Sequence, residues 1–121
     1  MSEKIILLVD DSRVARMLTR HAVEKAHADW VIVEAENGEE ALALAAAQHP
    51  DFALVDVNMP GIDGLSAARQ LRQQCPGTKI SLLTANIQEP IRLQAAQCGI
   101  GFMAKPLKDE MLAEFLGDAR P

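Results

Sequence analysis

The chain has 121 residues, of which 49% are apolar and 24% are charged, and its formal net charge is -5 at pH 7. This length suits one ordinary domain with its own core and is too short for two, so we expect a single domain over residues 1–121. Because the chain is acidic and has no basic patch, we do not expect nucleic acid or an anionic membrane surface to be a direct partner.

The apolar run Ile5–Val9 is far too short to span a membrane, and it ends in two acids instead of a cleavage site. Cys75 and Cys98 lie far apart and lack the spacing of metal ligands. We interpret them as reduced thiols that pack as small apolar side chains. Together these features predict a cytoplasmic protein without a membrane segment.

Strand and helix patterns alternate along the whole chain. Short apolar runs predict strands over residues 4–9, 30–35, 52–55, 79–83 and 100–104. Five helices are predicted between and after these strands. The first is capped by Ser12 and runs to about Lys25, and the second starts at Asn37 and is ended by His49-Pro50. The third runs from about Leu65 to before Pro76-Gly77, the fourth from Pro90 to a Gly99 C-cap, and the fifth over about 108–116.

Apolar positions at helical spacing support the first two helices. They are Val14, Met17, Leu18 and Ala22 in the first, and Ala41, Leu42, Ala45 and Ala46, expected to be its buried stripe, in the second. Five strand–helix repeats with short connections predict an α/β fold, a parallel sheet with helices on both faces. The order of the strands does not follow from this pattern.

Asp56 stands at the end of the most apolar of these strands. Residues 52–55 show no polar alternation, which indicates a strand covered on both faces. In open parallel sheets ligands bind beyond the carboxyl ends of the strands, so Asp56 is a candidate site residue. The alternative is that Asp56 only caps the following turn.

Polar residues follow four of the five strands and therefore share one edge of the sheet: Asp10 and Asp11, Asp56, Thr84, and Lys105. Carboxylates repel by about 4 kcal/mol per pair at 4 Å and an effective dielectric near 20, so the group needs a cation. Without a nearby His or Cys, the oxygen ligands suit Mg²⁺ better than zinc. A phosphoryl group would use all of these residues: the metal and Lys105 would neutralise its oxygens, Thr84 would donate a hydrogen bond, and an Asp would be the nucleophile.

These residues resemble the response regulator receiver domains of two-component signalling, of the chemotaxis type, over essentially the whole chain. The marks are Asp10-Asp11, Asp56 followed by Met59-Pro60-Gly61 and Asp63-Gly64, Thr84-Ala85, and Lys105-Pro106. The resemblance implies a flavodoxin-like receiver fold with five helices around a sheet in the order 2-1-3-4-5. It also implies that Asp56 accepts a phosphoryl group from a phosphohistidine on a sensor histidine kinase or a histidine phosphotransfer protein.

The resemblance also assigns a metal site and a switch. Asp11, Asp56 and the backbone carbonyl of Asn58 would bind Mg²⁺, and Asp10 would assist through water. Lys105 would contact the phosphoryl oxygens.

Thr84 would move to hydrogen-bond the phosphoryl group, and Phe102 would then turn inward and reshape the face made by the fourth helix, fifth strand and fifth helix. Phe102 has no hydroxyl, so this switch would act by packing. By the same analogy Asn58 and Asn86 would influence the lifetime of the acyl phosphate, whereas His21, His27 and His49 fall on helices away from the strand ends.

Two other functions remain open on the sequence. One is a magnesium-dependent phosphatase with an aspartate nucleophile, although such enzymes resemble Asp-x-Asp after the first strand. The other is a docking module that has lost phosphorylation. This hypothesis predicts that one of the acids or the lysine is missing from the strand ends. The receiver hypothesis predicts no enzyme, a downstream effector protein or an output domain outside this chain, and a monomer or a phosphorylation-dependent dimer.

Overall fold

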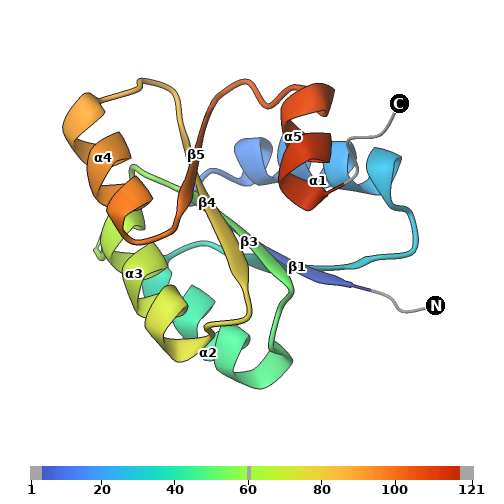
Figure 1. The fold of residues 1–121 in the computed structure, drawn as a ribbon. Helices are drawn as coiled ribbons and strands as arrows, with labels where there is room; N and C mark the ends of the chain where they lie inside the picture. The colour runs from blue at the N-terminus through green and yellow to red at the C-terminus, as the bar shows by residue number, and fades with distance from the viewer. Residues whose placement is uncertain (1–3, 60, 118–121) are drawn as a thin grey trace.

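The structure is a computed structural model that describes residues 4–59 and 61–117, so the motif residue Pro60 lies outside the described residues. Five strands alternate with five helices (Figure 1). The strands are β1 (Ile5–Val9), β2 (Val31–Ala35), β3 (Phe52–Asp56), β4 (Lys79–Thr84) and β5 (Gly101–Ala104). The helices are α1 (Arg13–Ala26), α2 (Gly38–Gln48), α3 (Gly64–Gln74), α4 (Glu89–Gln97) and α5 (Asp109–Leu116).

All four strand pairs are parallel, and the sheet order is β2-β1-β3-β4-β5. The predicted fold class and the implied order 2-1-3-4-5 are therefore confirmed. The helices α1 and α5 cover one face of the sheet, and α2, α3 and α4 cover the other (Figure 1). Because every strand runs in the same direction, all carboxyl ends meet at one edge, where a site can form.

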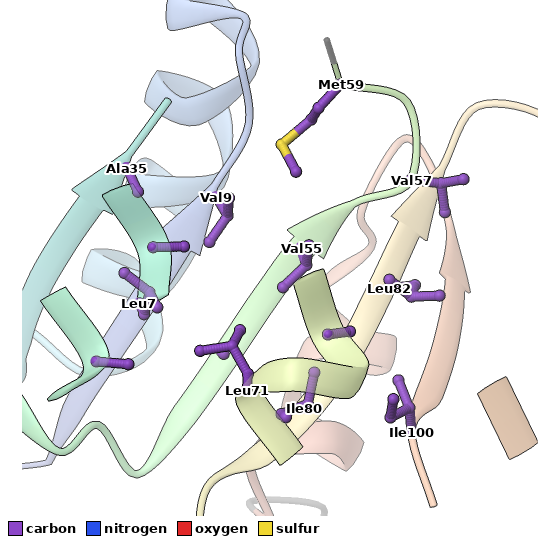
Figure 2. Close-up of a cluster of buried hydrophobic side chains, with 14 of the residues drawn as sticks. Leu7, Val9, Ala35, Val55, Val57, Met59, Leu71, Ile80, Leu82 and Ile100 are labelled. Atoms are coloured by element: carbon purple, nitrogen blue, oxygen red, sulfur yellow. The ribbon is translucent and has the colours of Figure 1, made fainter. Parts of the chain in front are cut away.

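The central strands bury both of their faces. In β1, Leu7 packs on the side of α2 and α3, whereas Leu8 packs on the side of α1 and α5. In β3, Val55 lies on the side of α2 and α3 (Figure 2), and Leu54 lies on the side of α1 and α5. Each fully buried side chain of this size stabilises the fold by roughly 1.5 to 3 kcal/mol, which holds β3 and the acid at its end in a fixed position.

Three polar side chains start helices as N-caps. Ser12 Oγ accepts a hydrogen bond from Ala15 N at 3.2 Å, Asn37 Oδ1 accepts one from Glu40 N at 2.8 Å, and Asp63 Oδ1 accepts one from Ser66 N at 2.8 Å. Each bond satisfies an amide of the first turn, so the predicted starts after Ser12 and Asn37 are confirmed.

The C-cap prediction for the fourth helix was wrong by one residue. Cys98 is the C-cap, and Gly99, with φ of 73°, occupies the left-handed position that follows it. Glycine is favoured there because it has no Cβ to clash.

The periodicity identified α1 correctly, but of the four apolar positions only Ala22 packs against the core. Val14, Met17 and Leu18 are 67%, 59% and 69% exposed. Instead Val23 is buried, and the neighbouring face of the helix directs Arg16 toward Glu34 of β2. The face of α1 that meets the sheet therefore carries Val23 and Arg16.

The predicted stripe of α2 is partly wrong. Ala41 and Ala45 are buried and Leu42 is half-buried, as expected, but Ala46 is exposed and Leu44 packs against the core in its place. The core face of this helix is thus rotated slightly toward Leu44.

Aromatic rings stack at the amino end of the sheet. Trp30, predicted to begin the second strand, lies one residue before β2, and its ring stacks on His27 and Phe52 with centroid distances of 3.8 and 5.3 Å. Phe52 in turn meets the ring of Phe115 edge-on at 5.7 Å. This stack joins the start of the sheet to the end of α5.

Within residues 4–59 and 61–117, none of the helices has the length and apolar character needed to cross a bilayer.

Candidate functional site

The carboxyl edge of the sheet brings three acids and a lysine together. Asp10 and Asp11 follow β1, Asp56 is the last residue of β3, and Lys105 follows β5. Lys105 Nζ lies 2.9 Å from Asp10 Oδ2 and 3.1 Å from Asp56 Oδ1. One carboxylate oxygen from each of the three acids lies within 4.8 Å of the others. Four predicted site residues thus form one cluster.

Backbone hydrogen bonds extend beyond the strands and hold these residues in register. Asp10 N donates to Ala35 O at 3.1 Å, and Lys105 N donates to Thr84 O at 2.7 Å. These bonds continue the parallel ladders by one residue past the strand ends. The positions of Asp10 and Lys105 are therefore fixed by the sheet rather than by flexible loops.

Asp10 is held through its side chain as well. Its Oδ1 accepts a hydrogen bond from Ser12 N at 2.9 Å, and its Oδ2 accepts the bond from Lys105. The residue is 5% exposed, and Asp56 is 6% exposed, whereas Asp11 is exposed. The pocket therefore has two inner acids and one acid at its rim.

Burial raises the pKa of Asp56, and the neighbouring Asp10 carboxylate raises it further, against the opposing hydrogen bond from Lys105. Burial alone would lower the pKa of Lys105, but its hydrogen bonds to Asp10 and Asp56 outweigh this, so its pKa is raised above the ordinary value. The lysine stays charged at neutral pH, and Asp56 carries unfavourable negative charge. The pocket would gain from a further cation.

Gly64 allows α3 to start against the end of β3. A Cβ placed on Gly64 would lie 2.0 Å from Asp56 O and 2.6 Å from Val57 Cα. Gly64 N also donates to Val57 O at 2.9 Å. Any larger residue would push the backbone of Asp56 out of place, which gives the Asp63-Gly64 motif a physical reason that the sequence pattern did not show.

Thr84 lies at the end of β4, and its side chain is buried. Its Oγ1 donates a hydrogen bond to Asn86 O at 2.7 Å and accepts one from Asn86 N at 3.1 Å. The hydroxyl thus ties strand β4 to the loop that leads into α4. Movement of this hydroxyl away from Asn86 would break both of these bonds to the loop.

Phe102 and Asn58 lie near this cluster without belonging to its hydrogen-bonded part. Phe102 is half-buried on the edge strand β5, opposite Leu82 of β4, and packs against the core. It also lines a groove of about 510 Å³ together with Met103 and Phe115. Asn58 is exposed in the loop after β3.

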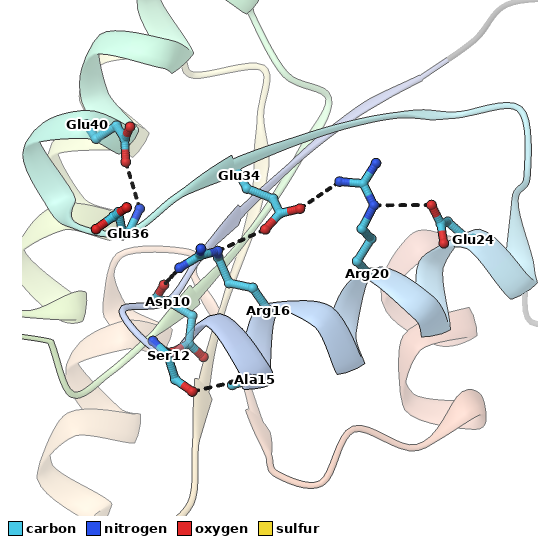
Figure 3. Close-up of polar contacts among 9 residues, drawn as sticks. All are labelled: Asp10, Ser12, Ala15, Arg16, Arg20, Glu24, Glu34, Glu36 and Glu40. Atoms are coloured by element: carbon cyan, nitrogen blue, oxygen red, sulfur yellow. Dashed lines mark hydrogen bonds and ion pairs between the residues drawn. The ribbon is translucent and has the colours of Figure 1, made fainter.

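Arg16 is a site neighbour that the sequence analysis missed. Its Nη1 donates to the backbone carbonyl of Asp10 at 2.6 Å, and its Nε donates to Glu34 Oε1 at 2.9 Å (Figure 3). An arginine in the first turns of a helix is common on solvated faces, so its type and position gave no signal. It reaches the pocket because α1 packs on β1 and its side chain pairs with Glu34 of β2.

The donor set of the pocket suits Mg²⁺. This ion takes oxygen ligands at about 2.0 to 2.1 Å and usually keeps several waters, so two of its direct ligands lie at most about 4.2 Å apart. The three acids, with oxygens within 4.8 Å, could hold such an ion if one of them acts through water. The arrangement is an acidic pocket that could bind a metal.

Comparison with known proteins agrees with this geometry. Residues 6–116 match the family model described as the response regulator receiver domain. The chain is 39% identical over 106 residues to the transcriptional regulatory protein ResD of Bacillus subtilis, covering 87% of this chain and 43% of ResD. It spans less than half the length of the first curated relatives it matches.

Two solved structures show the same fold. The chemotaxis protein CheY4 of Vibrio cholerae has a TM-score of 0.84 at 28% identity, covering 96% of this chain and 98% of that one. A response regulator protein from Burkholderia pseudomallei, solved with a phosphorylated aspartic acid, calcium ion and citrate, has a TM-score of 0.80 at 32% identity, covering 92% of this chain and 65% of that one.

The chain belongs to the response regulator receiver domain family. Its class is therefore a signalling domain that accepts a phosphoryl group in two-component signal transduction. The acidic cluster at the carboxyl edge of the sheet is the part of the molecule in which this chemistry can take place.

Proposed function

We propose that Asp56 is the phosphoacceptor of this receiver and that Asp10, Asp11, Lys105 and Thr84 assist it. The observation that carries the proposal is the contact of Lys105 Nζ with both Asp10 and Asp56 inside a pocket of three acids. The Asp56 carboxylate is buried, its pKa is raised, and Lys105 lies beside it. These features suit a nucleophile that attacks a phosphoryl group.

In the proposed transfer, a carboxylate oxygen of Asp56 attacks the phosphorus of a phosphohistidine. The new bond is oxygen to phosphorus, the nitrogen to phosphorus bond breaks, and the imidazole leaves with its electron pair and takes a proton from solvent. Lys105 turns from Asp10 to the phosphoryl oxygens and neutralises part of their charge.

Asp11, Asp56 and the backbone carbonyl of Asn58 would hold a Mg²⁺ ion, with Asp10 acting through water. When bound, the ion would supply electrostatic stabilisation of the phosphoryl oxygens. In its absence the three acids repel one another, which Lys105 only partly offsets.

We propose that the switch begins at Thr84. Its hydroxyl leaves Asn86 and bonds a phosphoryl oxygen, which frees the loop before α4. Phe102 then moves inward from its half-buried position and changes the face made by α4, β5 and α5. A shift from 1:99 to 99:1 requires about 5.5 kcal/mol of differential stabilisation, and several charge-assisted hydrogen bonds of roughly 1.5 to 3 kcal/mol each can supply it.

The remaining parts of the proposal concern the setting of the domain. Residues 1–121 act as one receiver domain in the cytoplasm, without an enzymatic activity beyond assisting phosphorylation and dephosphorylation of Asp56. The phosphodonor is a sensor histidine kinase or a histidine phosphotransfer protein. The signal passes to an effector protein or output domain, with no direct contact to nucleic acid or membrane by this domain, as a monomer or a phosphorylation-dependent dimer.

We further propose that Asn58 and Asn86 set the lifetime of the acyl phosphate. Asn58 is exposed two residues after Asp56, from where it would affect the approach of water, and Asn86 holds the Thr84 hydroxyl. Dephosphorylation rates that stay unchanged in variants at both positions would count against this role.

The decisive experiment measures intact-protein mass after incubation with acetyl phosphate, with and without Mg²⁺. The wild-type chain is expected to gain one phosphate only with Mg²⁺ and to lose it with time, and Asp56→Asn is expected to gain none. Asp109→Asn, an exposed acid on α5 paired with Lys25, is the matched control and should behave as wild type. No gain in folded wild-type protein would favour the docking module.

A further inference from the structure

The backbone of the two acids after β1 is fixed from outside the pocket. The carbonyl of Asp10 belongs to the peptide unit that joins Asp10 to Asp11, so its direction sets where the backbone of Asp11 goes next. Arg16 Nη1 donates to this carbonyl at 2.6 Å. Since Asp11 is exposed at the rim, the position of its carboxylate depends on this peptide.

Arg16 is itself held in place. Its side chain is 13% exposed, and its Nε donates to Glu34 Oε1 at 2.9 Å. Glu34 Oε2 accepts a second bond from Arg20 Nη1 at 2.6 Å, and the hydrogen bond from Arg16, with help from Arg20, lowers the pKa of Glu34 below its ordinary value. Glu34 therefore stays ionised and anchors the guanidinium that contacts Asp10 (Figure 3).

The geometry needs an arginine. A guanidinium is planar and offers several donors in a fixed fork, so one side chain can bond Glu34 and the Asp10 carbonyl at the same time. An ammonium group on a flexible stem holds no such fixed direction. Arg20, one helical turn further along, also binds Glu34, but its other partner is Glu24 on the far side from the pocket.

We propose that Arg16, anchored by Glu34, is a positioning residue that orients the Asp10–Asp11 peptide and thereby sets the affinity of the acidic pocket for a divalent cation. This inference rests on the proposed function of the pocket as a Mg²⁺ site. Groups that orient the direct ligands of a metal typically change its affinity by 10- to 100-fold when they are replaced.

The competing explanation is that the Arg16–Glu34 pair only fastens α1 to β2. Three variants separate the two. Arg16→Met removes the fork and keeps an unbranched stem, Arg16→Lys keeps the charge without the fork, and Arg20→Met removes the matched arginine that binds Glu34 but does not contact Asp10.

The test titrates Mg²⁺ into the 121-residue chain carrying each variant by calorimetry, and follows the amide signal of Asp11 by NMR before metal is added. We expect Arg16→Met to bind Mg²⁺ about tenfold more weakly than wild type, Arg16→Lys to show most of this loss, and Arg20→Met to stay within about twofold. The Asp11 amide signal of the metal-free protein should shift in both Arg16 variants and stay in place in Arg20→Met.

Wild-type affinity in Arg16→Met, or an equal loss in Arg20→Met, would overturn the inference, as would full recovery in Arg16→Lys. If Arg16→Met does not fold, Glu34→Gln frees the other end of the fork. Weaker Mg²⁺ binding by Glu34→Gln supports the inference. Unchanged Mg²⁺ binding by both Glu34→Gln and Arg16→Lys overturns the inference. Wild-type protein that binds no Mg²⁺ would instead overturn the proposed function.

Discussion

Lys105 bridges Asp10 and Asp56, two acids from different strands that are 46 positions apart in sequence, with nitrogen–oxygen distances of 2.9 and 3.1 Å. Its single positive charge compensates two buried carboxylates, while Asp11 adds a third nearby. The pocket is therefore one positive charge opposite three negative ones. This imbalance decides how the domain responds to pH, to metal and to substitution.

Lys105→Met should destabilise the domain by about 2 to 3 kcal/mol near pH 7, because it leaves buried carboxylates unpaired. Because the pKa of Asp56 is higher in the folded state, protonation of Asp56 favours folding. This contribution to stability is present below the unfolded-state pKa and is lost as pH rises through the folded-state pKa. Protonating Asp56 relieves the repulsion, so the deficit should be smaller in acidic buffer, where Asp56 begins to protonate, than at pH 7. Urea denaturation at both pH values measures this change.

The control for this variant is Lys105→Arg, which keeps a cation and should recover part of the loss at neutral pH. The raised pKa of Lys105 places its own titration in the alkaline range, where its contribution is lost as pH rises through the folded-state value. Lys105 therefore stays charged between about pH 5 and 8. A deficit of constant size across this range would contradict the electrostatic explanation.

Mg²⁺ should raise the free energy of unfolding of the wild-type chain by about 2.7 kcal/mol at a concentration of 100 times its Kd. Asp11→Asn should lose most of this gain without losing stability in metal-free buffer, since Asp11 is exposed and repels the other acids. Thermal unfolding with Mg²⁺ and with a chelator measures both effects. Equal stabilisation of Asp11→Asn and of Asp109→Asn would place the metal elsewhere.

Thr84→Val should lose about 1 to 2 kcal/mol of stability, because the part-buried amide and carbonyl of Asn86 lose their hydrogen bonds to the buried Thr84 hydroxyl. Thr84→Ser keeps the hydroxyl and should retain most of the stability. With acetyl phosphate and Mg²⁺, the Phe102 ring signals should shift in wild type and Thr84→Ser but not in Thr84→Val. A full shift in Thr84→Val would show that the hydroxyl does not begin the switch.

Gly64→Ala should destabilise the domain by about 3 kcal/mol or more, since its methyl group would overlap the carbonyl oxygen of Asp56. Gly77→Ala is the matched control, because a Cβ at Gly77 meets nothing within 4 Å. This change should alter stability by less than about 1 kcal/mol. Thermal unfolding compares the two. Similar losses in both would mean that the close approach at Gly64 is relieved at little cost.

Most of the fold could be predicted because buried parallel strands and amphipathic helices leave different patterns in a sequence. Strand limits matched within one residue, and β3 is covered on both faces as its apolar run indicated. The strand order could not be derived, since an apolar run carries no information about its neighbours. That order came only with the resemblance to receiver domains and is now confirmed.

We could predict where Asp10, Asp56 and Lys105 lie, because the carboxyl ends of parallel strands all lie at one edge of the sheet. The parts that could not be predicted depend on contacts between elements. Arg16 reaches Asp10 because α1 packs on β1, and Gly64 is required because α3 begins beside the end of β3. The same packing turns Val14, Met17 and Leu18 of α1 outward, since spacing alone does not tell which face meets the sheet.

The aromatic stack at the amino end of the sheet determines which part of this protein intrinsic fluorescence reports on. Trp30 is the only tryptophan and the chain has no tyrosine, so Trp30 dominates the intrinsic fluorescence. It stands at the start of β2, about 16 Å from the carboxyl ends at 3.3 Å per residue. Its emission therefore reports the packing of Phe52 and the end of α5, and an indole placed beside Asp56 would be needed to follow the pocket by fluorescence.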